Sequence, residues 1–272
     1  MSNFKEPKSV GGVKEYWDKR AAVMAENPSA TTNDVYLREL EAKTLIARLK
    51  ELNLPKKSHI LDVGCGNGYT LVKVAKEFEH FSFRGVDYSE EMIRAAKSLL
   101  EKSPDLKGRL SFAVGDATNL EDSIDGMLFN VVMSDRCLIN LESFQAQAGA
   151  IAGIARHVIG GGYYIAIENF MKGQRNFTEA REALGLPEIP VRWHNLFFDE
   201  ERFVAEVEKN FTDIEIISFA SSYYFATRVV YSKSCQMQGV EPDYEHPIHK
   251  LSIDLPPTGD FCPIKMAVMK RK

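Results

Sequence analysis

Cysteine is scarce in this chain of 272 residues. The four cysteines lie far apart in the sequence, at Cys65, Cys137, Cys235 and Cys262. None of them forms the close CxxC pairs that typically bind zinc, and the spacing does not indicate a disulfide scaffold. We therefore expect free thiols in a reducing compartment and no metal site.

Long apolar runs and clusters of basic residues are also missing. No stretch approaches the ~20 apolar residues of a membrane span, and residues 1–20 lack the apolar segment of a secretory signal. The net charge is −4, and the longest basic run is the tail at 270–272. Because nucleic-acid binding needs clustered Lys and Arg, we expect a cytoplasmic protein without a nucleic-acid or membrane partner.

Apolar residues, in contrast, are plentiful. They make up 44% of the chain, against 26% charged residues, which excludes disorder as the main state. The apolar segments that we interpret as strands are 59–63, 81–86, 110–114, 129–133, 163–167, 214–219 and 264–269. The segments with helical spacing are 34–52, 68–78, 89–100, 141–159 and 199–207. This alternation predicts an α/β fold with a doubly wound, mostly parallel sheet and helices on both faces.

Glycine and proline mark two further stretches. Three glycines at 160–162 are expected to end the helix 141–159. The interval 221–263 is expected to be loop-rich, because it contains Pro242, Pro247, Pro256, Pro257 and Pro263.

The most specific motif is the sequence LDVGCGNG at residues 61–68, which lies directly between a predicted strand and a predicted helix. Glycines there let the backbone approach a ligand closely, and the helix N-terminus offers N–H donors to an anionic group. The spacing GxGxG departs from the dinucleotide motif GxGxxG. The next strand ends in Asp87, which could accept hydrogen bonds from ribose hydroxyls. The third strand ends in Gly115-Asp116-Ala117, where the acid could accept an adenine amino hydrogen.

With these three strand ends, residues 58–220 and the final strand resemble the class I S-adenosylmethionine-dependent methyltransferases. The resemblance implies a seven-stranded sheet with an antiparallel last strand, and S-adenosyl-L-methionine as the cofactor. The glycine loop would then wrap the methionine part, Asp87 would hold the ribose, and Ser134-Asp135 would lie under the sulfonium. The cofactor-binding residues implied in this way are Asp62, Gly64, Cys65, Gly66, Asp87, Tyr88, Met92, Asp116, Ala117, Ser134 and Asp135.

The resemblance also divides the chain into three parts. Residues 1–57 would form an N-terminal helical cover, and 58–220 the cofactor-binding methyltransferase core. Residues 221–272 would supply an insertion that covers the substrate, followed by the final core strand. We expect the two covers to admit the substrate and to exclude water.

Substrate contacts are expected outside the C-terminal ends of the strands, where ligands bind in such sheets. The predicted substrate residues are Arg136, Asn140, Trp193, Asn195 and Tyr223. Arg136 could instead pair with Asp135 or Glu168. The turn after the fourth strand is neither the NPPY or DPPY turn of amino-group DNA methyltransferases nor the Pro-Cys turn of cytosine-carbon enzymes, which disfavours both.

His194 is the best candidate for a general base, because the ordinary pKa of histidine lies near working pH. The alternative is a histidine that only fixes the structure of its loop. Asp135, Glu168 and Asn169 match a magnesium site poorly in spacing and identity, so we predict no metal.

These features predict transfer of a methyl group to a small polar molecule, on a hydroxyl oxygen of a sugar or a secondary metabolite. Alignment of the reactants and exclusion of water would supply most of the rate. The alternatives are a nucleic-acid or protein methyltransferase, a NAD-dependent dehydrogenase, and a non-catalytic cofactor-binding partner of a larger complex. We expect a monomer or a homodimer.

Overall fold

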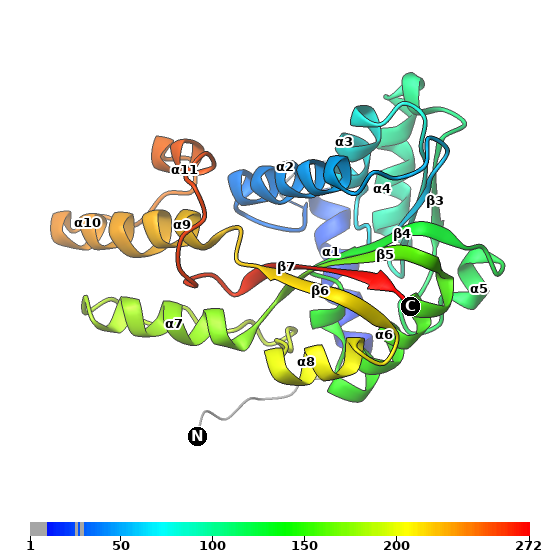
Figure 1. Cartoon of the computed structure of the whole chain (residues 1–272). Coiled ribbons are helices and arrows are strands. Elements are labelled where there is room, and N and C mark those ends of the chain that lie inside the picture. Colours follow the sequence, from blue (N-terminus) through cyan, green and yellow to red (C-terminus); the bar gives the residue numbers. More distant parts are fainter. Residues whose placement is uncertain (1–9, 25–26, 28–29) are drawn as a thin grey trace.

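The computed structural model describes residues 10–24, 27 and 30–272, and it is built around one sheet of seven strands (Figure 1). The strand order is β3-β2-β1-β4-β5-β7-β6. β7 is antiparallel to both of its neighbours, and the other pairs are parallel. The strands are β1 (His59–Val63), β2 (Ser82–Asp87), β3 (Leu110–Val114), β4 (Phe129–Asp135), β5 (Val158–Asn169), β6 (Phe211–Ile217) and β7 (Ile264–Arg271). The predicted fold class is confirmed.

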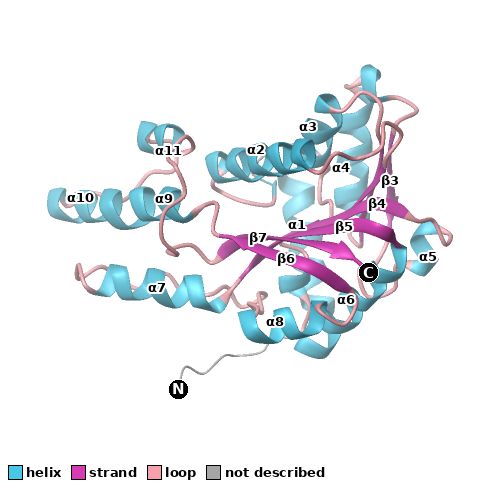
Figure 2. Ribbon diagram, viewed as in Figure 1, coloured by secondary structure: helices cyan, strands magenta, loops and turns pink. Residues whose placement is uncertain are grey.

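Helices cover both faces of this sheet (Figure 2). Side chains of successive strand residues point to opposite faces, so Ile60 and Leu61 of β1 belong to different apolar cores. The first core is shared with α2 (Val35–Glu51), α3 (Tyr69–Glu77) and α4 (Glu90–Glu101). The second is shared with α5 (Glu121–Ile124), α6 (Phe144–His157) and α8 (Glu200–Val207). Within the described ranges, no helix is long and apolar enough to cross a membrane.

The three glycines at 160–162 do not end a helix, as the sequence had indicated. α6 ends at His157, and β5 begins at the next residue, so the glycines lie within the strand. A Cβ atom on Gly162 would lie 2.7 Å from the carbonyl oxygen of Asn130. Gly162 therefore allows β5 to pass close to β4, which is a role that glycine can have within a strand.

The prediction of a loop-rich interval at 221–263 is wrong for its first half. The chain is helical there through α9 (Ser221–Tyr224), the π-helical turn η4 (Phe225–Val230) and α10 (Tyr231–Gln238). No proline interrupts residues 221–241, and Pro247 lies in the first turn of α11 (Pro247–Ser252), where its missing N–H costs no hydrogen bond. These helices extend beyond the sheet on the left of Figure 1.

α7 (Met171–Glu182) also extends beyond the sheet, and the sequence did not reveal it because its residues are mostly polar. One glycine brings this helix against the segment before β7. A Cβ atom on Gly173 would lie 2.0 Å from the carbonyl oxygen of Cys262, so no larger residue fits without a backbone shift.

A Gly173→Ala variant should therefore lower the free energy of unfolding, by about 2 kcal/mol for overpacking of this kind. Urea unfolding measures the loss. Gly149→Ala in α6 is the matched control, because a Cβ atom there would meet no other atom within 4 Å among the described residues. That variant should gain up to about 1 kcal/mol in helix propensity. Equal stabilities for the two variants would contradict the packing argument.

Candidate active site

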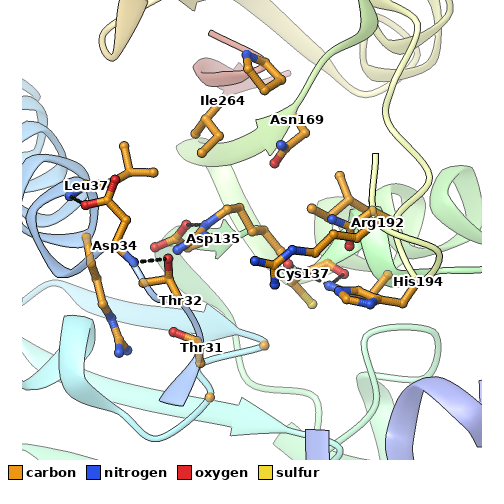
Figure 3. A pocket seen from close by; sticks show the side chains of 18 of the residues that line it. Thr31, Thr32, Asp34, Leu37, Asp135, Cys137, Asn169, Arg192, His194 and Ile264 are labelled. Atoms are coloured by element: carbon orange, nitrogen blue, oxygen red, sulfur yellow. Dashed lines mark hydrogen bonds and ion pairs between the residues drawn. The ribbon is translucent and has the colours of Figure 1, made fainter. Parts of the chain in front are cut away.

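One cavity of about 260 Å³ opens at the carboxyl ends of β1, β4 and β5. Its floor is the glycine loop between β1 and α3 together with the ends of these strands. The labelled side chains in Figure 3 come from opposite sides, with Thr31, Thr32 and Asp34 facing Arg192 and His194 across the space. Segments far apart in the sequence therefore meet at this cavity.

The glycine loop has a backbone that only glycine adopts easily. Gly64, Gly66 and Gly68 have φ angles of +76°, +54° and +73°. A Cβ atom on Gly64 would lie 2.3 Å from the Sγ atom of Cys137, which lies in the loop after β4. The loop after β1 and the loop after β4 are thus packed together at the cavity.

The Asp87 carboxylate ties this loop to the end of β2. It accepts hydrogen bonds from the backbone N–H groups of Gly66 and Ser89, both at 2.9 Å. Burial raises the pKa of Asp87 to about 6, although these two N–H donors oppose the shift. The carboxylate lines the cavity and is held rigidly, so it can accept further hydrogen bonds from a ligand.

Asp62 lies at the end of β1 and is also buried. Its Oδ1 atom has no hydrogen bond within the described part of the chain. Burial raises its pKa, and the nearby carboxylates of Asp135 and Asp87 raise it further. Three acids therefore surround one end of the cavity, and a cationic group placed there would stabilise their charged forms.

The structure brings together most of the predicted residues. The predicted positions that line the cavity are Asp62, Gly64, Cys65, Gly66, Asp87, Tyr88, Met92, Asp135, Arg136, Asn140, His194 and Asn195. Those that do not line it are Asp116, Ala117, Ser134, Trp193 and Tyr223.

Each of these exceptions has a local reason. Asp116 is exposed and accepts a hydrogen bond from the Thr118 N–H at 2.8 Å, so it stabilises its own turn beside Ala117. The buried Ser134 hydroxyl donates to Glu168 at 2.9 Å. The Trp193 side chain points outward and is 47% exposed.

Tyr223 is buried away from the cavity because it belongs to a helix and not to a loop. Its hydroxyl donates a hydrogen bond to Asp34 at 2.7 Å. Successive residues of a helix point about 100° apart, so Tyr224 lines the cavity in its place.

Arg136 forms the internal ion pairs that were its alternative role. Its guanidinium lies 2.9 Å from the fully buried Glu41 and 3.5 Å from Asp135, and not beside Glu168. Its φ angle is +52°, a left-handed conformation that is unusual for a residue other than glycine. The chain therefore turns sharply after β4, into the short helix η3 (Leu138–Asn140).

Glu168 of β5 holds this turn in place. Its fully buried carboxylate accepts hydrogen bonds from the N–H groups of Leu138 at 3.0 Å and Ile139 at 3.3 Å, in addition to the Ser134 hydroxyl. Burial raises the pKa of Glu168 to about 7 against the effect of these donors. The sequence suggested Glu168 as a partner of Arg136 or as a poorly matched magnesium ligand, and not as the acceptor that holds this turn. An acid at the end of an otherwise apolar strand was the available signal.

His194 is buried among aromatic rings. Its ring stacks on Tyr16 at a centroid distance of 4.6 Å, and Trp17 and Trp193 lie edge-on at 5.6 and 5.2 Å. The Nδ1 atom has no hydrogen bond to any described residue. Burial lowers the pKa of His194 to about 4, and the charges of Arg192 and Arg20 add to this effect. The expectation of a pKa near working pH is therefore corrected, and the imidazole is neutral at pH 7.

Two segments outside the central strands complete the cavity, and both lie in the parts of the chain that were expected to cover the substrate. From the N-terminal side come Trp17 of α1 (Val10–Met24) and residues 31–34. From the C-terminal side come Tyr224, Arg228 and Tyr244.

A buried ion pair between Asp34 and Arg228 joins the two segments. Burial alone would raise the pKa of Asp34, but the charge and hydrogen bond of Arg228 lower it overall. The same carboxylate accepts the Leu37 N–H at 3.0 Å and thereby caps α2.

The strand order, the antiparallel β7 and the cavity at the glycine loop define a class I, Rossmann-like methyltransferase fold. Magnesium protoporphyrin IX methyltransferase from Synechocystis, solved with bound S-adenosylhomocysteine, shares this fold with a TM-score of 0.62. The alignment covers 97% of this chain and 100% of that chain at 14% identity. A family model described as a methyltransferase domain matches residues 54–216. The chain belongs to this family.

Curated relatives match shorter parts of the chain. Human EEF1A lysine methyltransferase 2 is 28% identical over 120 residues, which cover 43% of this chain and 50% of that protein. Demethylmenaquinone methyltransferase of Leptospira interrogans is 30% identical over 158 residues, which cover 56% and 60%. The chain thus spans about half the length of these relatives.

The cofactor of this class is S-adenosyl-L-methionine, and the cavity residues fit it. The cofactor carries a sulfonium and an ammonium group, and the unbonded, buried Oδ1 of Asp62 can accept a hydrogen bond from the ammonium. The Asp87 carboxylate is positioned to accept from neutral hydroxyls. Among the described residues, no three His, Cys, Asp or Glu side chains are grouped so as to hold a metal ion.

Proposed function

We propose that this protein transfers a methyl group from S-adenosyl-L-methionine to a hydroxyl oxygen of a small polar molecule, such as a sugar or a secondary metabolite. The observation that carries this proposal is the single cavity that the glycine loop and His194 both line. A cofactor at the loop and an acceptor at the histidine would then share one enclosed space. A cytoplasmic location and a monomeric or homodimeric state are further predictions.

The number of elements around the cavity supports a small acceptor. Residues of α1, α2, α7 and η4 all line it, so there are walls on several sides of the space beyond the strand ends. The human relative is named for a protein lysine, so a protein substrate is the second candidate. It would have to insert a single extended side chain.

The reaction asks little of the protein beyond alignment and the exclusion of water. When bound, the cofactor supplies a methyl group on a positively charged sulfur. Asp87 would hold its ribose hydroxyls, and Asp62 its amino group. The neutral His194 imidazole would accept a hydrogen bond from the acceptor hydroxyl, which would orient the oxygen and allow the ring to take its proton.

A His194→Ala variant should lower kcat by about tenfold, since a base with a low pKa contributes less than a well-matched one. Cofactor affinity should stay within twofold in calorimetry, roughly the error of such comparisons. His246→Ala is the control, because His246 is exposed and does not line the cavity. Full activity of His194→Ala would contradict the assignment of His194 as a general base.

The function itself is tested by screening acceptors for release of S-adenosylhomocysteine. The panel should contain sugars, alcohols and phenols, matched amines, and lysine peptides, with NADH as a competing ligand in binding assays. Hydroxyl acceptors should be turned over, and NADH should not displace the cofactor. Turnover of amines or peptides alone would contradict the proposal, and binding of NADH at the glycine loop would restore the dehydrogenase alternative.

A further inference from the structure

Four arginines line the cavity, and three of them are engaged with the protein. Arg136 pairs with Glu41 and Arg228 with Asp34. Arg38 is buried and donates to the Asn67 side chain at 3.0 Å in the glycine loop. Their donors are therefore directed at protein groups and not at a ligand.

Arg192 is different. Its side chain lines the cavity beside His194 (Figure 3), and it makes no hydrogen bond or ion pair with any described residue. The turn that carries it is ordered, since the Asn195 N–H donates to the Arg192 carbonyl at 3.0 Å. The Asn195 side chain also lines the cavity, and within the described ranges it has no hydrogen bond.

The two ends of the cavity consequently differ in charge. At the glycine loop, the carboxylates of Asp62, Asp87 and Asp135 lie close enough to raise the pKa of Asp62, and Arg38 offsets this only in part. At the other end, Arg192 forms no ion pair within the part of the chain that the structure describes, and its positive charge lowers the pKa of the neighbouring His194. The negative end suits the cationic cofactor, so the positive end is left for the acceptor.

We propose that the acceptor carries an anionic group, a carboxylate or a phosphate, which Arg192 binds with Asn195 as a second donor. This inference rests on the proposed function. The planar guanidinium of an arginine can donate two parallel hydrogen bonds to such a group, which orients the ligand and also strengthens its binding. The anion would place the acceptor hydroxyl beside the His194 imidazole, which also lines the cavity.

Tryptophan fluorescence gives a direct test without methyl transfer. The chain has two tryptophans, and both Trp17 and Trp193 lie against the His194 ring. The probes are para-hydroxybenzoate and its neutral match para-hydroxybenzamide, titrated with S-adenosylhomocysteine present. The benzoate should bind more tightly than the benzamide, by about fivefold for a partly exposed charge pair.

Arg192→Gln should abolish this preference and leave the affinity for S-adenosylhomocysteine unchanged. Arg175→Gln on α7 is the control, because Arg175 is exposed and outside the cavity, and it should keep the preference. Inorganic phosphate as a competitor distinguishes a phosphate subsite from a carboxylate subsite. Equal binding of the two probes by the wild type, or an unchanged preference in Arg192→Gln, would overturn the proposal. The proposed function would not be affected by that result, because the acceptor screen tests it independently of this measurement.

Discussion

An Asp87→Ala variant should bind S-adenosyl-L-methionine about a hundredfold more weakly, because hydrogen bonds to a buried charged group contribute a few kcal/mol together. The substitution removes the acceptor for the ribose hydroxyls that we assign to this residue. It also frees the N–H groups of Gly66 and Ser89, so the glycine loop loses its tie to β2. Titration calorimetry measures the change.

Asp116→Ala is the matched control for this variant, because Asp116 ends the neighbouring strand but is exposed. It should bind the cofactor almost normally. A large loss in Asp116→Ala would instead support the adenine contact that the sequence implied. Unchanged affinity in Asp87→Ala would refute the site assignment.

The pH dependence follows from the raised pKa of Asp87. Its carboxylate accepts hydrogen bonds, whereas its protonated form is a weaker acceptor. With a pKa of about 6 in the free protein, cofactor affinity should fall as the pH drops below 6. In Asp87→Asn this dependence should disappear, which calorimetry at pH 5 and pH 8 can check.

Glu168→Ala should lower the free energy of unfolding by about 3 kcal/mol, since it leaves buried donors without an acceptor. Those donors are the N–H groups of Leu138 and Ile139 and the Ser134 hydroxyl. The turn after β4 should loosen, so kcat should fall more than cofactor affinity. Glu188→Gln, on an exposed loop, is a neutral control.

The sign of the pH effect on stability is opposite to that of an ordinary surface acid. Burial raises the pKa of Glu168 from 4.5 to about 7, so the folded protein binds this proton more tightly than the unfolded chain. Its contribution to stability is complete below pH 4.5 and is lost as the pH rises through 7. Glu168→Gln should flatten that slope, measured by urea unfolding at pH 5 and pH 8. An equal slope in both proteins would contradict this role.

The sequence predicted the sheet and the glycine loop because both depend on neighbouring residues. Short apolar segments between helical segments located all seven strands, and the GxGxG spacing located the tight turn before α3. The cavity residues at the ends of β2 and β4, Asp87 and Asp135, could be predicted because they directly end these strands. Local patterning was sufficient wherever the side chain of interest directly followed a strand.

The remaining features depend on contacts between distant segments. The low pKa of His194 comes from burial beside α1 and from the charges of Arg192 and Arg20, and the positions of α1 and Arg20 could not be predicted from the residues around His194. Tyr224 and not Tyr223 lines the cavity because the segment is helical, and a predicted loop has no helical phase. The role of Glu168 could be predicted only by knowing that the turn after β4 lies over the end of β5.

The ion pair between Asp34 and Arg228 has a consequence for the order of events during turnover. It joins the segment before α2 directly to η4, so these two walls of the cavity are attached to each other as well as to the sheet. The glycine loop lines the same cavity at the ends of the strands. We therefore expect the cofactor to enter first and the spent cofactor to leave last, in an ordered kinetic scheme. Product-inhibition patterns should show S-adenosylhomocysteine competing with the cofactor and not with the acceptor.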